Sequence, residues 1–175
     1  TQHQELSGKK LQYFDPELQE SYVPYVVETS VGLDRMFLAV LSAAYQEETL
    51  EDGSERVVLK IPAVLAPYKA AILPLIKKDG LPEKAREIMA QLQLEYSVQY
   101  DEKDSIGKRY RRQDAIGTPF SITVDHQTLE DNTVTIRDRD TMTQERIAIA
   151  ALENVIADKA SWKRVLSDLI SWVVK

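Results

Sequence analysis

The feature that most constrains the fold is a pair of alternating segments between residues 117 and 140. Apolar and polar side chains alternate from Phe120 to Val124 and again, after a polar connection, from Thr133 to Arg137. Alternation with a period of two is typical of half-buried β-strands. The connection is rich in Asp, Asn and His, which tolerate turn geometry. A wide antiparallel hairpin with one packed and one solvated face is therefore predicted.

The hairpin ends in alternating charge, Arg137-Asp138-Arg139-Asp140. An arginine held by a neighbouring carboxylate presents a fixed fork of donors, which suits phosphates and base edges. The same pattern also protects an edge strand from aggregation, with surface ion pairs that add little stability. The residues alone leave both interpretations open.

Composition limits the classes of function. The 175 residues are 43% hydrophobic and 29% charged, as expected of a globular protein with one good core or two small ones. The chain has no cysteine and only two histidines, His3 and His126, so neither disulfides nor a metal site are expected. No apolar run has membrane-spanning length and no signal peptide is recognisable, which predicts a cytoplasmic protein.

The net charge of −6 argues against broad, sequence-independent binding of nucleic acid, because such binding needs many phosphate contacts. It leaves room for a small basic patch. Lys108, Arg109, Arg111 and Arg112 surround Tyr110, and cations around an aromatic ring suit a single-stranded RNA loop. A solvated helix face is the alternative interpretation.

In the first part of the chain, the spacing of apolar residues changes from that of a strand to that of a helix. The chain opens on Thr1 in a polar stretch without an obvious core, so we expect a fragment whose partner strands lie upstream. Residues 22–27 are predicted to form a strand, and the apolar spacing from Leu33 to Ala44 predicts an amphipathic helix. Gly32 lies between them, where a helix N-terminus could offer free N–H groups to an anion.

An acidic link over residues 47–56 is predicted to separate this part from a second unit. The second unit is expected to contain extended, strand and helical segments with a partly parallel, right-handed crossover. These segments are an extended stretch at 56–67, a buried strand at 69–75, a helix from Leu81, strands at 96–100 and 143–149, a helix at 151–159, and a final helix capped by Ser161. The apolar stripe of the final helix, from Trp162 to Val173, is predicted to be core.

The segment from Tyr25 to Arg35, YVVETSVGLDR, resembles motif 3 of class II aminoacyl-tRNA synthetases in its glycyl form. The resemblance implies that Arg35 engages ATP in catalysis, with Gly32, Leu33 and Asp34 beside it. It also implies a glycine pocket formed by Glu28, Thr29, Ser30, Val31 and Gly32. The chemistry suits these roles, because an arginine fork neutralises phosphate and a carboxylate holds an ammonium group.

LAPYKAAILPL, GKRYRRQDAIGTPFSITVD and VTIRDRDTMTQERI resemble the anticodon-binding domain shared by glycyl-, prolyl-, threonyl- and histidyl-tRNA synthetases. Together the resemblances cover roughly Ser7 to Lys175. They imply an α/β fold, with a mixed five-stranded sheet between helices, preceded by a strand-helix tail of the antiparallel catalytic domain. The implied division is catalytic tail 1–50, linker 51–56 and anticodon-binding domain 57–175.

The family implies the ATP-dependent ligation of glycine to its tRNA through glycyl-adenylate, with Mg²⁺ and in a homodimeric parent. Motifs 1 and 2 are missing, so this chain alone is expected to be inactive. The residues expected to meet the anticodon are Arg109, Tyr110, Arg112, Arg137 and Arg139. Two alternatives are a non-catalytic relative of the polymerase accessory type and a prolyl or threonyl enzyme; the Glu-Thr-Ser sequence before Gly32 disfavours the second.

Overall fold

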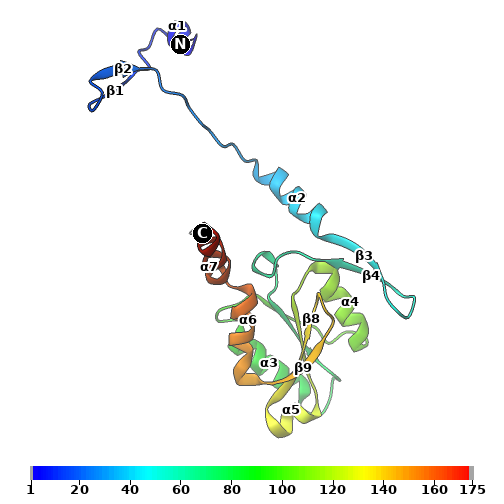
Figure 1. The fold of residues 1–175 in the computed structure, drawn as a ribbon. Coiled ribbons are helices and arrows are strands. Elements are labelled where there is room, and N and C mark those ends of the chain that lie inside the picture. The colour runs from blue at the N-terminus through cyan, green and yellow to red at the C-terminus, as the bar shows by residue number, and fades with distance from the viewer. Residues whose placement is uncertain (1, 174–175) are drawn as a thin grey trace. The chain divides into compact units, whose positions relative to one another are not determined.

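The computed structural model describes residues 2–173, except for the side chains of Arg164, Asp168, Trp172 and Val173. Its contacts divide the chain into two compact units, Thr1–Met36 and Phe37–Lys175. The first unit holds α1 (Gln2–Ser7) and a small hairpin of β1 (Tyr13–Asp15) and β2 (Glu20–Tyr22). Helix α2 (Leu33–Ala44) begins in the first unit and ends in the second (Figure 1).

The second unit contains a mixed five-stranded sheet in the order β6-β5-β7-β8-β9. Strand β5 pairs in parallel with β6 and β7, whereas β7, β8 and β9 are antiparallel neighbours. These pairings confirm the α/β class, the mixed sheet and the hairpin. The strands are β5 (Ala70–Pro74), β6 (Val98–Tyr100), β7 (Phe120–Val124), β8 (Thr133–Asp138) and β9 (Gln144–Ala148).

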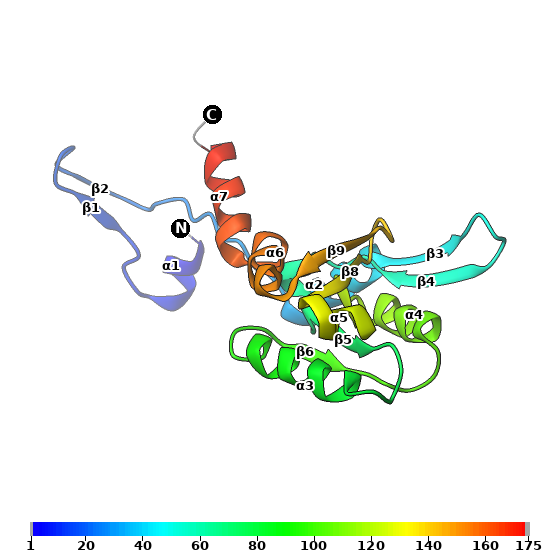
Figure 2. The same ribbon diagram turned by 90° about the horizontal axis from the view of Figure 1, so that it is seen from below.

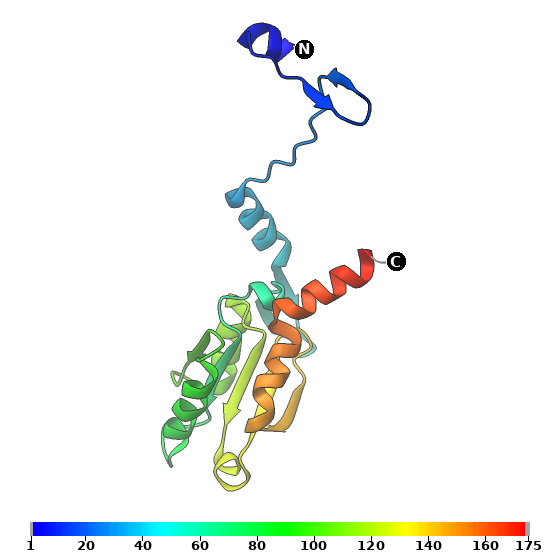
Figure 3. The same ribbon diagram turned by 90° about the vertical axis from the view of Figure 1, so that its left-hand side faces the viewer.

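Helices cover both faces of the sheet. On one face, α3 and α6 pack against Ile72, Ile122 and Val134 to form the main core (Figure 3). Helix α4 covers part of the other face, where the Tyr110 hydroxyl lies 2.7 Å from that of Thr123. Helix α3 starts with Pro82 in its first turn and buries the predicted apolar stripe. The helices are α3 (Leu81–Leu92), α4 (Ile106–Ile116), α5 (His126–Asp131), α6 (Leu152–Ala160) and α7 (Trp162–Val173).

The central hairpin differs from its prediction in two respects. All five residues of β7 are buried, including Ser121 and Thr123, because helices cover both sides of this strand. The polar connection is not a turn but helix α5. The Asp125 side chain accepts the Thr128 N–H, and the Thr128 hydroxyl accepts the Asp125 N–H, which forms a capping box.

The acidic segment forms a second hairpin instead of a linker. Strand β3 (Tyr45–Thr49) follows α2 directly and pairs antiparallel with β4 (Glu55–Leu59), and Figure 2 shows the pair extending beyond the large sheet. Residues 50–54 are its tight connection, in which Gly53 has a φ of 78°. The polar composition of 47–56 therefore marks a solvent-exposed hairpin, not a boundary between units.

Two further predictions were wrong. The predicted strand over 22–27 includes only the last residue of β2, since no described strand pairs with residues 23–27. On α7 the apolar stripe is not core: Trp162, Leu166, Leu169 and Ile170 are all more than half exposed, because α7 leaves the end of α6 without covering the sheet. Val173 lies outside the described side chains.

The segment between the small hairpin and the large sheet agrees better with its prediction from the sequence. Residues 56–67 are extended in β4 and then form a short 3₁₀ turn, η1 (Ala63–Leu65), between prolines. The Lys69 ammonium donates to the Ala63, Val64 and Ala66 carbonyls of this turn. A second 3₁₀ turn, η2 (Ile149–Ala151), leads into α6. No described helix is long and apolar enough to cross a membrane.

The structure predicts how far the chain can be shortened from its N-terminus before the second unit loses stability. A chain of residues 37–175 should unfold cooperatively, because it keeps β3, β4 and the sheet. A chain of 57–175 loses β3 and the buried Arg56, so its thermal midpoint should be clearly lower. Thermal unfolding of both chains by circular dichroism checks this, and equal midpoints would show that the hairpin contributes nothing to stability.

Candidate nucleic-acid interface

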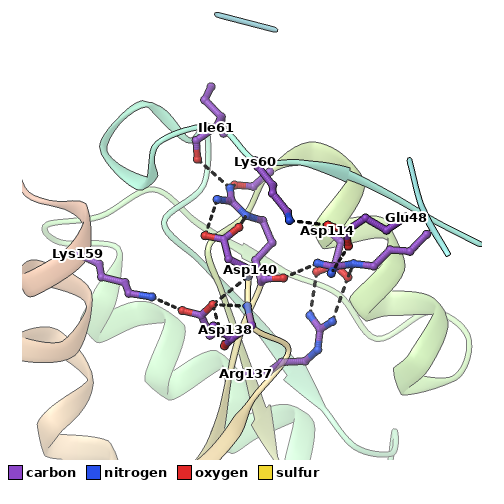
Figure 4. A network of polar contacts seen from close by, with 12 residues as sticks. Glu48, Lys60, Ile61, Asp114, Arg137, Asp138, Asp140 and Lys159 are labelled. Atoms are coloured by element: carbon purple, nitrogen blue, oxygen red, sulfur yellow. Dashed lines mark hydrogen bonds and ion pairs between the residues drawn. The ribbon is translucent and has the colours of Figure 1, made fainter. Parts of the chain in front are cut away.

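A buried network of arginines and carboxylates lies where α4, β4 and the end of β8 meet (Figure 4). At its centre the fully buried carboxylate of Asp114, on the last turn of α4, accepts from two guanidinium groups. Arg137 of β8 donates through both Nη atoms at 2.8 and 3.1 Å, and Arg56 of β4 donates through Nε at 3.0 Å. One carboxylate thus binds side chains from two different sheets.

The remaining donors of Arg56 also have partners. Nη1 donates to Glu48 of β3 at 2.9 Å, and Nη2 donates to the backbone carbonyl of Arg139. Glu48 is itself 2.5 Å from the Lys60 ammonium, which holds the pKa of this carboxyl below its usual value. The hairpin β3–β4 is therefore attached to the large sheet by charge-assisted hydrogen bonds that exclude water.

Arg139 follows β8 and is only 3% exposed. Its Nη1 donates to the Ile61 and Gly117 carbonyls at 2.9 and 2.8 Å, and its Nε and Nη2 hold Asp140. Gly117 ends α4 with a φ of 83°, and a Cβ there would lie 2.7 Å from the Ile61 side chain. This backbone geometry and close packing require glycine at the site where Arg139 binds.

The structure therefore corrects both interpretations of the charged segment. Strand β8 is not an edge strand, because it lies between β7 and β9. Arg137 and Arg139 do not face solvent, and their guanidinium groups are bound to Asp114, Asp140 and backbone carbonyls. They hold the site together and leave no fork of donors free for a base.

The predicted cluster of basic residues on α4 is likewise only partly exposed for contact with RNA. Arg109 is buried at the carboxyl ends of β5 and β6, where it donates to the Pro74, Leu75 and Asp101 carbonyls. Burial lowers its pKa, although a guanidinium remains charged at neutral pH, and its Nε is buried without a described partner.

Arg112 and Tyr110 lie closer to solvent. Arg112 is exposed and bridges Asp101 and Asp104 at 2.8 and 2.9 Å; its pKa is raised, chiefly by the hydrogen bonds to Asp101 and Asp104. Tyr110 is half-buried, with the Arg137 guanidinium 4.9 Å from its ring centre. The structure thus brings Tyr110 and Arg137 together and links Arg139 to the same network through Arg56. Arg109 and Arg112 meet elsewhere, at Asp101.

The motif-3 segment is exposed. Residues 28–32 have no regular secondary structure, and Leu33, Asp34 and Arg35 form the first turn of α2. Among the described residues, no ion pair joins Glu28 to Arg35. Glu28, Thr29, Ser30, Val31 and Gly32 are all exposed, and the described residues contain no cluster of acidic or histidine side chains able to hold a metal ion.

A cavity of about 510 Å³ opens between α6 and the β8–β9 end of the sheet. Sequence reasoning missed it, as it missed Arg56 and Asp114. One signal was present, because Asn154 and Asp158 are four residues apart on one helix. The lining residues are Phe120, Ile136, Asp138, Thr141, Thr143, Glu145, Asn154, Val155, Asp158 and Lys159.

The network makes Asp114 essential to stability. Asp114→Ala leaves Arg56 and Arg137 buried without their shared carboxylate, which should lower the free energy of unfolding by about 3–5 kcal/mol. Asp104→Asn is the control, because it breaks a solvent-exposed ion pair with Arg112, keeps a residue that tolerates the φ of 67° at this position, and should leave the denaturation midpoint almost unchanged. Urea unfolding of the two variants measures both effects. A small loss in Asp114→Ala would contradict the role of the network.

Comparison with known proteins agrees with this architecture. The family model described as "Anticodon binding domain" matches residues 69–159, from just before β5 to the end of α6. The chain is 55% identical over 159 residues to a protein named glycine–tRNA ligase from Chlorobaculum tepidum, and 56% identical over 156 residues to one from Clostridium beijerinckii. These alignments cover 91% and 89% of this chain but only 34% and 33% of the relatives.

A solved structure with the same fold is the RNA binding domain of threonyl-tRNA synthetase from Cryptosporidium parvum. It superposes with a TM-score of 0.53 at 23% identity, covering 58% of this chain and 26% of that one. The family model spans more than half of the chain and includes all five strands of the large sheet. The chain belongs to the anticodon-binding domain family of the aminoacyl-tRNA synthetases.

Proposed function

We propose that this chain is the C-terminal part of a glycine–tRNA ligase and that its second unit binds the anticodon loop of the glycine-specific tRNA. The observation that supports this most directly is the family match over 69–159, which takes in the sheet, α4 and the cavity. Identities of 55% and 56% to glycine–tRNA ligases support the same substrate. The protein would act in the cytoplasm, where its tRNA is charged.

The first unit would belong to the catalytic domain. Motif 3 gives Arg35 the role of binding ATP phosphates, beside Gly32, Leu33 and Asp34, and gives Glu28 and Ser30 contacts to glycine, flanked by Thr29 and Val31. The full-length ligase would use ATP and Mg²⁺ and act as a homodimer. Because the contacts divide the chain at Met36 and Phe37, we place the domain boundary within α2 rather than after residue 50.

The anticodon contacts are reassigned within the second unit. Arg137 and Arg139 support the site from its interior, and Arg109 fixes the carboxyl ends of β5 and β6. The exposed Lys108 offers positive charge on α4, whereas the Arg112 guanidinium is paired with Asp101 and Asp104. Tyr110 lies on the same helix. Such a small patch fits a loop of few phosphates, in agreement with the net charge of −6.

The proposal predicts selective binding of RNA by the isolated chain. The 175-residue chain should bind a stem-loop with a glycine anticodon more tightly than one with an altered anticodon. Lys108→Ala should weaken both complexes alike and reduce the salt slope by about one, as expected of a phosphate contact. Lys163→Ala, on α7, is the matched control and should change neither complex. Fluorescence titration that finds no binding of either loop would refute the proposal.

The role of Arg35 is tested in the full-length ligase. Arg35→Ala should slow ATP–pyrophosphate exchange by about 100- to 1,000-fold, because it removes a donor aimed at developing phosphate charge. Binding of tRNA should change little, since the anticodon contacts remain. Exchange at the wild-type rate would show that Arg35 only begins the helix.

A further inference from the structure

Helix α7 carries an apolar face that the described part of the chain leaves uncovered. The spacing of its large apolar residues places them on one side of the helix. They are more than half exposed, except for the half-buried Val165. The exposed members are Trp162, Leu166, Leu169 and Ile170. A contiguous apolar face of this kind marks a surface for contact with another element.

The core of the large sheet is complete without α7. Helix α6 contributes Leu152, Ile156 and Ala160 to this core, whereas none of the described side chains of α7 belongs to it or packs against it. The family model of the anticodon-binding domain also ends at residue 159, before α7 begins. The apolar face of α7 therefore does not hold this domain together and is free to bind another surface.

The face is too small to hold a separate molecule tightly. Helix α7 has 12 residues. A helix of this length is about 18 Å long and about 10 Å wide, so its footprint is roughly 180 Å². Stable interfaces between separate proteins bury about 800 Å² on each partner, which disfavours a pair of copies joined through α7. A partner in the same polypeptide needs far less area, because its effective concentration is roughly millimolar.

A lipid surface also suits α7 poorly. Helices that lie on membranes are rich in lysine and arginine on their polar side. The sequence of α7 has two cations, Lys163 and Arg164, and one carboxylate, Asp168. The whole chain has a net charge of −6, which anionic lipid head groups repel. Size and charge together favour an occupant in the same polypeptide.

We infer that the apolar face of α7 packs against the catalytic part of the parent ligase, in the polypeptide that precedes residue 1. The inference rests on the proposed function. The alignments cover only 34% and 33% of two relatives, so most of such a protein lies outside this chain. Helix α2, which begins in the motif-3 segment, has an uncovered apolar face of the same kind at Leu33, Met36 and Phe37. Two uncovered helix faces are expected where the larger part of a protein is absent.

This contact sets the position of the anticodon-binding domain. Only Ser161 separates α7 from α6, and α6 is anchored in the core by Leu152 and Ile156. Fixing α7 therefore limits movement of the sheet relative to the catalytic part. A tRNA must reach the anticodon site and the catalytic site at the same time, so the contact promotes charging of tRNA. Formation of glycyl-adenylate, which needs no tRNA, is independent of it.

The test compares two double variants of α7. The leucine variant, Leu166→Gln with Leu169→Gln, places polar amides on the apolar face. The control variant, Lys163→Gln with Ser167→Gln, places the same amides on the polar side, and glutamine suits a helix in both. In the 175-residue chain neither variant should shift the thermal midpoint, because all four side chains are exposed there.

The first readout is amide hydrogen exchange. A short helix without tertiary contacts opens readily, so the amides of α7 should exchange about tenfold or more slowly in the full-length ligase than in the 175-residue chain. The leucine variant should remove this difference, and the control variant should keep it. The second readout is activity. In the leucine variant kcat/KM for tRNA should fall about tenfold while ATP–pyrophosphate exchange stays at the wild-type rate, because only the position of the tRNA is affected.

Each outcome decides. Equal exchange of the α7 amides in the two chains overturns the inference, whatever the activity. Slower exchange that depends on the concentration of the 175-residue chain assigns the face to a second copy. Slower exchange on adding vesicles of phosphatidylcholine and phosphatidylglycerol assigns it to a lipid surface, and either result overturns the inference. Wild-type charging by the leucine variant removes the positioning role. A full-length protein that charges no tRNA refutes the proposed function, while hydrogen exchange still decides the contact.

Discussion

The buried carboxylate of Asp114 is the interaction on which the rest of the second unit depends. It brings Arg56 from the small hairpin and Arg137 from the large sheet to one point, and Arg139 binds the same region through backbone carbonyls. Burying charged groups is costly unless each is paired and hydrogen-bonded. Here nearly every donor has a partner, so the network fixes the positions of β4, α4 and β8 relative to one another.

The two faces of the large sheet differ in character, one being apolar and the other polar. The face toward α3 and α6 is filled by Ile72, Ile122, Val134 and their neighbours, and supplies most of the apolar burial. The face toward α4 is polar, with Tyr110 on Thr123 and Asp114 on Arg137. The arginines of β8 belong to this inner polar layer and do not face solvent.

Local patterns in the sequence predicted most of the elements. Period-two alternation located β7, β8 and β9, and the apolar spacing and Pro82 located α3. Patterns could not show which helix covers which face, so the burial of Ser121 and Thr123 was missed. The partners of Arg137 and Arg139 were missed for the same reason: Asp114 is 23 residues from Arg137 in the sequence, and only the folded sheet brings them together.

The apolar stripes of α2 and α7 show that helical periodicity does not predict whether a helix face is buried. Both have the periodicity of helices that pack against a core, yet Phe37 on α2 and Leu166 on α7 are more than half exposed. The period shows that one face of a helix is apolar, but it does not show which other element covers that face. The same distinction applies to charge at the site, where Glu48 and Glu145 are both carboxylates on β-strands. Glu48 is neutralised by Arg56 and Lys60, whereas Glu145 has no described partner.

The negative net charge fits the recognition of an RNA loop. A carboxylate near RNA is repelled by phosphates, but salt screens this repulsion beyond about 8 Å at physiological ionic strength. Hydrogen bonds to a base act at contact distance and are screened much less. For the proposed function, an acidic chain with a small basic patch limits general binding of RNA, whereas a broadly basic surface would bind any RNA.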